Sequence, residues 1–189
     1  MRLSRRAVLF GAAAAIGRAS FAWGQDDTLW QALRQGGLFL FMRHANAPGI
    51  GDPPNLKVED CSTQRNLSDL GREQARRMGE EFRRRSIAIA SVQSSRWCRC
   101  LDTARSAFGT AEPMELLDSI FTAAERNEPQ TRDLRAHLAE LPPVAGNRVY
   151  VTHAANISAL LDIGTGDANI HVTRRDGAAL QRLGILAPP

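Results

Sequence analysis

The chain has 189 residues, of which 43% are hydrophobic and 23% are charged. This is the composition of one globular domain rather than of a disordered or fibrous chain. Four arginines that precede the first acidic residue carry the whole formal net charge of +4, so the rest of the chain is neutral. Because nucleic-acid binding depends on surplus positive charge, no nucleic-acid partner is expected.

The amino terminus has the pattern of an export signal. Arg5 and Arg6 precede an apolar stretch over residues 7–16, and a charged start followed by such a stretch is typical of a secretory signal. The stretch is too short to span a bilayer, which takes roughly 20 apolar residues. The paired arginines followed by Val8, Leu9 and Phe10 resemble a twin-arginine signal.

Small residues near the end of this segment offer two cleavage points, after Ala22 or after Gly24. We therefore expect a signal peptide over residues 1–24 and one domain over residues 25–189, with no membrane span in the mature chain. The expected location is periplasmic or secreted.

Export affects how the three cysteines are interpreted, because an oxidising compartment permits one disulfide and leaves one thiol. Cys98 and Cys100 are too close in sequence to pair well with each other. Cys61 with either of them would join two loops, and closing a loop of nearly forty residues would stabilise the fold by roughly 3–4 kcal/mol. Three reduced cysteines are the alternative.

The first elements of the domain follow from its apolar pattern. Residues 28–35 predict a short helix, and the continuous apolar run 38–42 predicts a strand buried on both faces. Residues 46–64 contain several prolines and glycines and predict a loop. A helix then starts at Ser68, which is a suitable N-cap.

The remaining pattern continues the alternation of strands with helices, which indicates an α/β class with a mostly parallel central sheet. We expect a single three-layer domain with helices on both faces of that sheet. The predicted strands are residues 87–92, 149–151 and 180–186, and the predicted helices are 98–108, most of 112–141, and 156–163.

Polar side chains follow three of the predicted strands. Arg43 and His44 follow the first, Ser94 and Ser95 the second with Arg99 close behind, and His153 the third. Ligands of open α/β sheets gather beyond the carboxyl ends of the strands. Arginines and helix N-termini bind phosphate, and a neutral histidine beside them is a nucleophile for phosphorus.

Four stretches in register resemble motifs of the histidine phosphatase superfamily, in its phosphoglycerate-mutase-like branch. Residues 40–45 resemble the strand that ends in the Arg-His nucleophile motif, and residues 67–75 resemble the helix start Leu-Thr-x-x-Gly-x-x-Gln-Ala. Residues 94–104 resemble the stretch Ser-Ser-x-x-x-Arg-x-x-x-Thr-Ala, and residues 151–153 resemble the second histidine motif. The resemblance implies a phosphoglycerate-mutase-like fold.

The resemblance also implies catalytic roles. His44 would attack phosphorus and form a phosphohistidine, while Arg43, Arg99 and a cationic His153 would hold the three equatorial oxygens. Positioning and electrostatics of this kind carry most of the catalysis in phosphoryl transfer. No metal ion or other cofactor is required. Candidates for contact with the substrate are Arg65, Asn46 and Glu128.

The general acid that protonates the leaving alcohol is a glutamate in the related branch, some two dozen residues after the second arginine. Glu125 and Glu128 lie in that range. We favour Glu125, with Asp118 as a third candidate. The family plan that places an acid directly after the second histidine is excluded, since that position is Ala154.

The expected activity is hydrolysis of a phosphomonoester outside the cytoplasm. The mutases of the family carry a Leu-x-Glu-x-x-x-Gly-x-x-Glu-Gly element, and the corresponding stretch from Glu115 to Asp118 lacks its glycines. The substrate would be a phosphorylated small molecule or an envelope glycolipid phosphate. The alternatives are a catalytically inactive phosphate-binding module and a phosphomutase.

Overall fold

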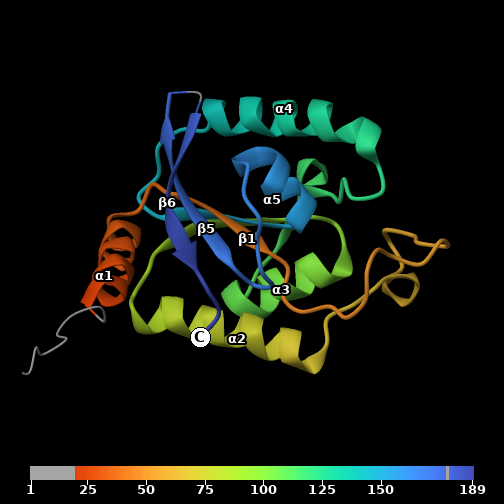
Figure 1. Ribbon diagram of the computed structural model, residues 1–189, viewed down its shortest axis with the longest axis horizontal. Coiled ribbons are helices and arrows are strands. Elements are labelled where there is room, and N and C mark those ends of the chain that lie inside the picture. Colours follow the sequence, from red (N-terminus) through yellow and green to blue (C-terminus); the bar gives the residue numbers. More distant parts are fainter. Residues whose placement is uncertain (1–19, 178) are drawn as a thin grey trace, which may run out of the picture.

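The computed structural model describes residues 20–177 and 179–189, in which helices and strands alternate along the chain (Figure 1). The helices are α1 (Ser20–Gln35), α2 (Asp69–Arg84), α3 (Cys98–Phe108), α4 (Ala124–Glu140) and α5 (Ala154–Leu161), with two short 3-10 helices, η1 (Cys61–Thr63) and η2 (Glu115–Leu117). The strands are β1 (Phe39–Arg43), β2 (Ile89–Ser94), β3 (Glu112–Pro113), β4 (Asn147–Thr152), β5 (Ile170–Asp176) and β6 (Ala179–Leu186).

The strands form one sheet in the order β3-β2-β4-β1-β5-β6. The first four strands of this order run parallel to one another, and β5 is antiparallel to both of its neighbours. In the register of the central pair, Arg43 of β1 lies opposite Thr152 of β4. The carboxyl ends of β1, β2 and β4 therefore meet at the same edge of the sheet.

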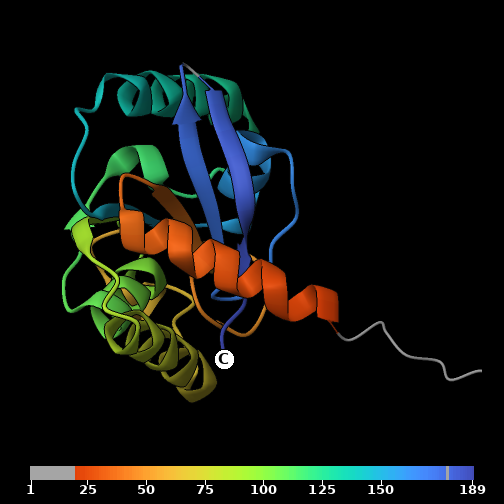
Figure 2. The same ribbon diagram turned by 90° about the vertical axis from the view of Figure 1, so that its left-hand side faces the viewer.

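Alternate residues of each central strand face opposite layers, as the pleat of a strand requires. Leu40 and Met42 pack in a core with residues of α1, α2 and α3. Phe39 and Phe41 pack in a second core with residues of α4 and α5. Figure 2 shows α4 on the opposite side of the sheet from α2 and α3. The predicted α/β class, a single three-layer domain with a mostly parallel sheet, is confirmed.

The start of α2 follows the prediction closely. The side chain of Ser68 accepts a hydrogen bond from the backbone N–H of Gly71 at 3.0 Å, which satisfies one free donor of the first turn. Ala75, Met78 and Phe82 recur on one face of the helix and are all buried. Because these apolar residues recur about once per helical turn, one face of α2 packs in the core beneath the sheet.

Two predicted helical segments begin at other residues than expected, and one strand was not predicted. The segment 112–141 is mostly helical, as expected, but it first forms β3 and η2, and its long helix α4 begins only at Ala124. The helix predicted over 156–163 begins earlier, with His153 as its N-cap. Strand β5 was not expected, since its second half is charged.

That charged half of β5 has a packing role that the sequence pattern hides. Arg175 donates hydrogen bonds through Nη1 to the backbone carbonyls of Leu138, Ala139 and Leu141, at 3.0, 2.8 and 2.7 Å. These carbonyls belong to the end of α4, where a helix leaves acceptors without partners. The hairpin of β5 and β6 thus caps α4.

The predicted signal peptide lies largely outside the described residues, which begin at residue 20. Both predicted cleavage points, after Ala22 and after Gly24, fall within α1. The signal peptide stays a prediction. Among the helices of the described part, none combines the length and apolarity that crossing a membrane takes.

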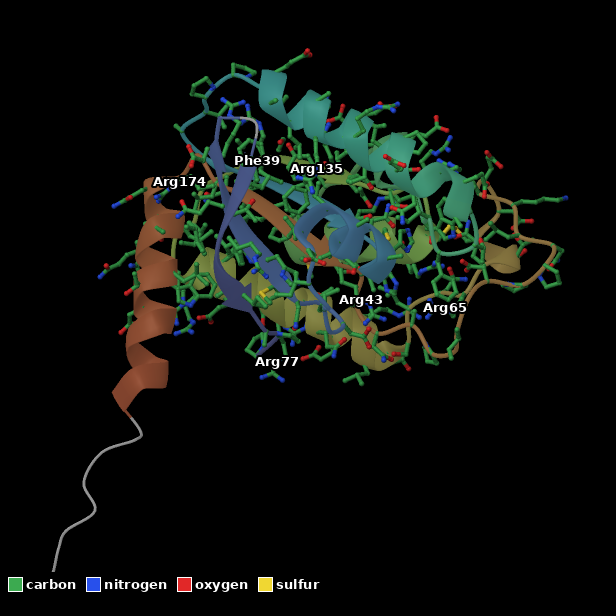
Figure 3. All side chains as sticks on the ribbon, turned by 45° about the horizontal axis from the view of Figure 1, so that its top comes forward. Phe39, Arg43, Arg65, Arg77, Arg135 and Arg174 are labelled. Atoms are coloured by element: carbon green, nitrogen blue, oxygen red, sulfur yellow. A yellow bond between two sulfur atoms is a disulfide. The ribbon has the colours of Figure 1, made fainter. Side chains whose placement is uncertain are left out.

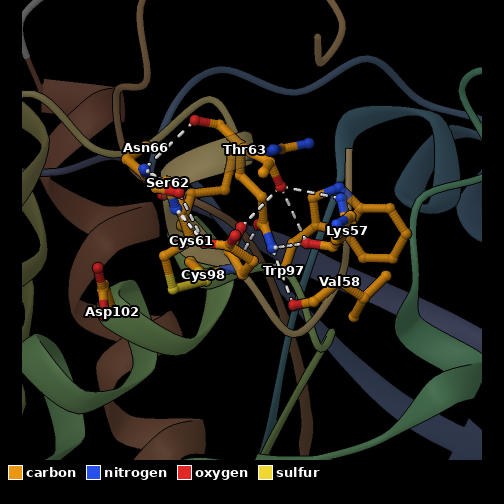
Figure 4. The surroundings of a disulfide bond; sticks show 12 residues. Lys57, Val58, Cys61, Ser62, Thr63, Asn66, Trp97, Cys98 and Asp102 are labelled. Atoms are coloured by element: carbon orange, nitrogen blue, oxygen red, sulfur yellow. Dashed lines mark hydrogen bonds between the residues drawn. A yellow bond between two sulfur atoms is a disulfide. The ribbon is translucent and has the colours of Figure 1, made fainter. Parts of the chain in front are cut away.

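The disulfide joins Cys61 to Cys98, with their Cα atoms 5.7 Å apart (Figure 4). Cys100 is a buried free thiol. The bond ties the loop that contains η1 to the first turn of α3, across a sequence separation of 37. Closing a loop of that length stabilises the folded state by about 4 kcal/mol in the chain-entropy account.

The contact between α2 and α3 predicts a strong effect of Gly79→Ala. A Cβ atom at Gly79 would lie 1.9 Å from the backbone oxygen of Ala107, so the two helices would have to separate. Despite a gain of about 1 kcal/mol in helix propensity, we expect the free energy of unfolding to fall by about 2 kcal/mol or more. Urea unfolding measures this change.

Gly164→Ala is the matched control, because a Cβ atom there meets nothing within 4 Å. We expect its free energy of unfolding to stay within about 0.5 kcal/mol of the wild type. Equal stability of the two variants would contradict the packing argument.

Candidate active site

The ends of β1, β2 and β4 bring the motif residues to one place. The backbone N–H of His44 donates to the oxygen of Thr152 at 2.9 Å, and that of Ser95 donates to the oxygen of Val151 at 2.9 Å. These bonds extend the parallel ladders by one residue beyond the strands. His44 and Ser95 are therefore fixed against β4, beside His153.

A cavity of about 480 Å³ opens at this edge. Figure 3 shows Arg65 beside the loop 46–64 and Arg43 nearer the centre of the view. That loop and the segment after η2 both contribute to the wall. The lining residues are Arg43, His44, Gly49, Ile50, Gly51, Asp52, Pro53, Pro54, Leu56, Arg65, Trp97, Arg99, Ser119, Phe121, Thr122, His153, Ala154 and Ala155.

His44 has the geometry of a nucleophile. Its Nδ1 lies 2.8 Å from the backbone oxygen of Ala45, so Nδ1–H donates to that carbonyl and the lone pair is on Nε2. No hydrogen bond from the described residues engages Nε2. Burial lowers the pKa of His44 to about 3, although the bond to Ala45 opposes the shift, and the charges of Arg99, Arg43 and Arg65 add to it. The imidazole is therefore neutral at neutral pH.

Arg99 is held at the back of the pocket by an acid. Its Nη1 and Nη2 lie 2.7 and 3.0 Å from the two carboxylate oxygens of Asp52, a bidentate pair of the kind that arginine also forms with phosphate. The side chain of Arg99 is 3% exposed, and its Nε is buried without a hydrogen-bond partner among the described residues.

Arg43 and Arg65 line the pocket from the loops around it. Arg43 pairs with Asp167 at 3.0 Å and donates to the backbone oxygen of Thr165 at 3.2 Å. Its Nε is likewise buried without a partner within the described part of the chain. Arg65 donates through Nε to the oxygen of Gly51 at 2.8 Å and through Nη1 to that of Ala47, so it also holds the loop in place.

His153 is oriented by its neighbours. Its Nδ1 lies 3.4 Å from Nη2 of Arg99, and its Nε2 lies 2.9 Å from the hydroxyl of Ser95, which lies 3.3 Å from Asp118 Oδ1. Arg99 can only donate, so Nδ1 accepts and Nε2–H donates to Ser95.

The charge of His153 differs from the expectation. Burial, followed by the charge of Arg99, lowers its pKa well below the usual value. The ring is therefore neutral rather than the expected cation. A bound phosphate beside Nδ1 would favour the protonated form, because an opposite charge nearby raises the pKa of a histidine.

Three of the predicted site residues do not line the pocket. Glu125 is exposed at the start of α4, and Glu128 is exposed one turn later beside a separate hollow between α4 and α5. The amide of Asn46 donates to Asp167 at 2.9 Å and accepts from Ser68 at 2.6 Å, which braces the loop. The structure thus gives no geometric support to Glu125 as the acid or to Asn46 and Glu128 as substrate contacts.

Asp118, the third candidate for the acid, is fully buried and pairs with Arg96. Its oxygens accept from the backbone N–H of Arg96 at 2.9 Å and from Nε of that residue at 2.7 Å. It does not line the pocket. Its carboxylate therefore fixes the turn after β2 and, through Ser95, the orientation of His153.

Two residues at the pocket escaped the sequence analysis. Asp52 provides the only carboxylate among the lining residues of the described chain, and the indole Nε1 of Trp97 donates to it at 3.1 Å. The signal was the sequence Gly51-Asp52-Pro53-Pro54, an acid held in a stiff loop, but nothing in the sequence indicates which arginine it faces.

The lining groups suit an anion rather than a cation. Three arginines and two neutral histidines face a single carboxylate. Among the described residues, no group of three or more His, Cys, Asp or Glu side chains is placed to hold a metal ion. The first residues of α5 also line the pocket, where a helix presents free N–H groups.

Comparison with known proteins agrees with this site and fold. A family model, histidine phosphatase superfamily (branch 1), matches residues 39–120. That span contains the first three of the four motifs. A search of curated proteins found no match.

Several solved structures share the fold. The protein histidine phosphatase SixA complexed with tungstate has a TM-score of 0.60 and 15% identity, over 80% of this chain and 97% of that one. The phosphoserine phosphatase of Entamoeba histolytica has a TM-score of 0.60 and 12% identity, over 79% and 96%. A mycobacterial glucosyl-3-phosphoglycerate phosphatase has a TM-score of 0.55 and 18% identity, over 80% and 98%.

The arrangement of strand ends, histidines and arginines is that of a phosphoryl-binding α/β protein. Residues 39–120 match the model of the histidine phosphatase superfamily (branch 1), and the fold of the chain is the fold of these phosphatases.

The buried, neutral His44 predicts a specific dependence of stability on pH. Its folded pKa of about 3 lies below the unfolded value of 6.5, so between these values only the unfolded state takes up the proton. The free energy of unfolding then falls as the pH falls, by about 1.4 kcal/mol per pH unit from this group. We expect a slope between pH 5.5 and 4 that is shallower by that amount in His44→Asn.

Urea unfolding of the wild type and of His44→Asn at several pH values measures both slopes. The difference between the slopes isolates His44 from the other titrating groups. Parallel slopes would mean that His44 is not held neutral by burial.

Proposed function

We propose that the protein is a phosphomonoester hydrolase that works through a phosphohistidine intermediate. The observation that carries this proposal is the free Nε2 of neutral His44 in a pocket lined by Arg43, Arg65 and Arg99. A nucleophile and a cluster of anion-binding groups are the parts that phosphoryl transfer needs.

In the first step, the Nε2 lone pair of His44 forms a bond to phosphorus while the bond to the leaving oxygen breaks. The backbone oxygen of Ala45 accepts a hydrogen bond from Nδ1–H and so keeps the ring in the reactive tautomer. As positive charge develops on the ring, the same carbonyl stabilises it. His44, Arg99 and His153 are themselves buried, so little water screens these electrostatic effects.

The arginines would hold the oxygens of the transferring group. Buried donors normally have partners, yet the Nε groups of Arg43 and Arg99 have none among the described residues. A phosphate would satisfy such donors and balance the positive charge that Asp52 and Asp167 leave on the three arginines. His153, protonated beside that phosphate, would donate to a further oxygen through Nδ1.

In the second step, a water oxygen attacks phosphorus and the bond to His44 breaks. Phosphate is released and the neutral imidazole returns. The names of the structural neighbours support a phosphorylated small molecule as the substrate, since one of them is a glucosyl-3-phosphoglycerate phosphatase. An envelope glycolipid phosphate is the second substrate class that we propose to test.

A binding module without turnover is the competing function. It is favoured by the carboxylate of Asp52, which occupies both Nη groups of Arg99, and by the absence of Glu125 and Glu128 from the pocket lining. Such a protein would bind vanadate tightly and hydrolyse no phosphomonoester.

We further propose that the protein acts outside the cytoplasm after removal of residues 1–24. The disulfide between Cys61 and Cys98 supports this location, because disulfides persist in oxidising compartments and are rare in the cytosol. The paired Arg5 and Arg6 before an apolar stretch support a twin-arginine route.

The proposed activity predicts that the mature chain releases p-nitrophenol from p-nitrophenyl phosphate, also in the presence of a metal chelator. His44→Ala should lower kcat by about 10⁴-fold or more, because the covalent route is lost. Mass spectrometry of the enzyme quenched during turnover should find the phosphoryl group on His44. Undiminished activity of His44→Ala would overturn the proposal, and vanadate binding without hydrolysis of any substrate would favour the binding module.

The proposed export predicts that residues 1–30 carry a fused reporter protein across the membrane. Replacing both Arg5 and Arg6 by lysine should leave the reporter inside, because the twin-arginine route reads the guanidinium pair. Cell fractionation measures the location. A reporter that stays inside with the native sequence would contradict the proposal.

A further inference from the structure

The proposed hydrolysis needs a proton donor, because an alkoxide is a poor leaving group. The pocket offers a single carboxyl group for this task among the described residues, that of Asp52. The other three acidic candidates do not line the pocket. Glu125 and Glu128 are exposed on α4, while Asp118 is buried against Arg96.

Asp52 is held at the pocket wall by groups that do not depend on Arg99. Its Oδ1 accepts from the backbone N–H of Arg65 at 3.1 Å, and its Oδ2 accepts from the indole Nε1 of Trp97 at 3.1 Å. Asp52 is therefore anchored even when Arg99 turns to another anion. Its carboxyl group stays beside the place where a phosphate would sit.

We propose that Asp52 is the general acid and base of this site, and that it takes up this role when the substrate's phosphate replaces it on Arg99. The proposal rests on the proposed hydrolysis. The bidentate contact with Asp52 shows that both Nη groups of Arg99 are available to bind two oxygens of one oxyanion, as they would those of a phosphate. The carboxylate and the phosphate thus compete for the same donors.

The exchange accounts for the protonation of Asp52. Burial works to raise the pKa of Asp52, but the hydrogen bonds from Arg99 and Arg65 and the charge of Arg99 lower it overall. Once Arg99 binds phosphate, that lowering is lost, and the negative phosphate disfavours a second negative charge beside it. The backbone N–H of Arg65 and the indole of Trp97 then remain as its hydrogen-bond donors, and the other titratable groups that line the cavity are Arg43, His44, Arg65 and His153.

The proton has a defined route. A phosphomonoester that binds as its monoanion carries one proton, which moves to Asp52 as the dianion settles on Arg99. When the P–N bond to His44 forms and the P–O bond breaks, Asp52 gives that proton to the leaving oxygen. In the second step the Asp52 carboxylate takes a proton from the attacking water, and the P–N bond breaks to release phosphate.

The test compares two substrates with Asp52→Asn, which keeps the shape of the side chain and cannot donate the acidic proton. Glycerol phosphate has an alkoxide leaving group, whereas p-nitrophenolate leaves without a proton. We expect kcat/KM to fall about 100-fold or more for glycerol phosphate and less than about fivefold for p-nitrophenyl phosphate. Asp133→Asn, exposed on α4, is the matched control and should leave both rates unchanged.

Orthovanadate binding measures the fold and the pocket of Asp52→Asn separately. We expect binding at least as tight as in the wild type, because the competing charge on Arg99 is gone. Equal losses for both substrates with vanadate binding intact would overturn the assignment, as would an unchanged rate on glycerol phosphate. A loss that depends on the leaving group in Glu125→Gln instead would also overturn it.

Failure of the hydrolase proposal has a different signature. In that case the wild type hydrolyses neither substrate, or His44→Ala is as active as the wild type. An active wild type that depends on His44 but shows no leaving-group effect in Asp52→Asn would refute the role of Asp52 alone.

Discussion

The parallel pairing of β1 with β4 is the constraint on which the site depends. Arg43 and Thr152 are in register at the end of this pair, so the next residues, His44 and His153, leave the sheet side by side. Their ring centroids lie 5.4 Å apart. A shift of either strand by one residue would turn every side chain to the opposite layer, and the buried phenylalanines of β1 and Tyr150 of β4 oppose such a shift.

Charge and burial act together at this edge. Burial lowers the pKa of both histidines, so their rings are neutral at neutral pH. The arginines are therefore the permanent cations of the pocket. The carboxylate of Asp52 balances Arg99 and that of Asp167 balances Arg43, while Arg65 forms no salt bridge with another described residue. The site therefore carries a surplus positive charge that an incoming anion would balance, which gives a physical reason for binding oxyanions.

Most of the architecture could be predicted because it follows from local pattern. Apolar runs identified three of the central strands, and the spacing of Ala75, Met78 and Phe82 identified α2 and its buried face. Polar residues after those strands identified His44, Arg99 and His153, since strand ends converge in an α/β sheet. Strand β5 was not predicted, because the charged residues Arg174, Arg175 and Asp176 hide the apolar pattern of its first half.

The acidic partner of the site could not be predicted in this way. Its identity depends on how a long loop folds back over Arg99, which is a tertiary contact across a sequence separation of 47. Spacing relative to a family motif pointed to Glu125, yet that side chain is exposed at the start of α4 and does not line the pocket. Loop conformation is set by packing and by backbone hydrogen bonds to side chains such as Arg65, which periodicity does not report.

The bond between Cys61 and Cys98 has a mechanical consequence. Cys98 is adjacent to Arg99, and Cys61 lies in the loop 46–64 that also contains Asp52 and its prolines. The base of the loop is thereby fastened to the helix that carries the arginine. Thermal fluctuations that open the loop tip leave its anchored end in place, because separating that end would require breaking a covalent link rather than local unfolding. The disulfide therefore limits how far the loop and the first turn of α3, which carry Asp52 and Arg99, can separate.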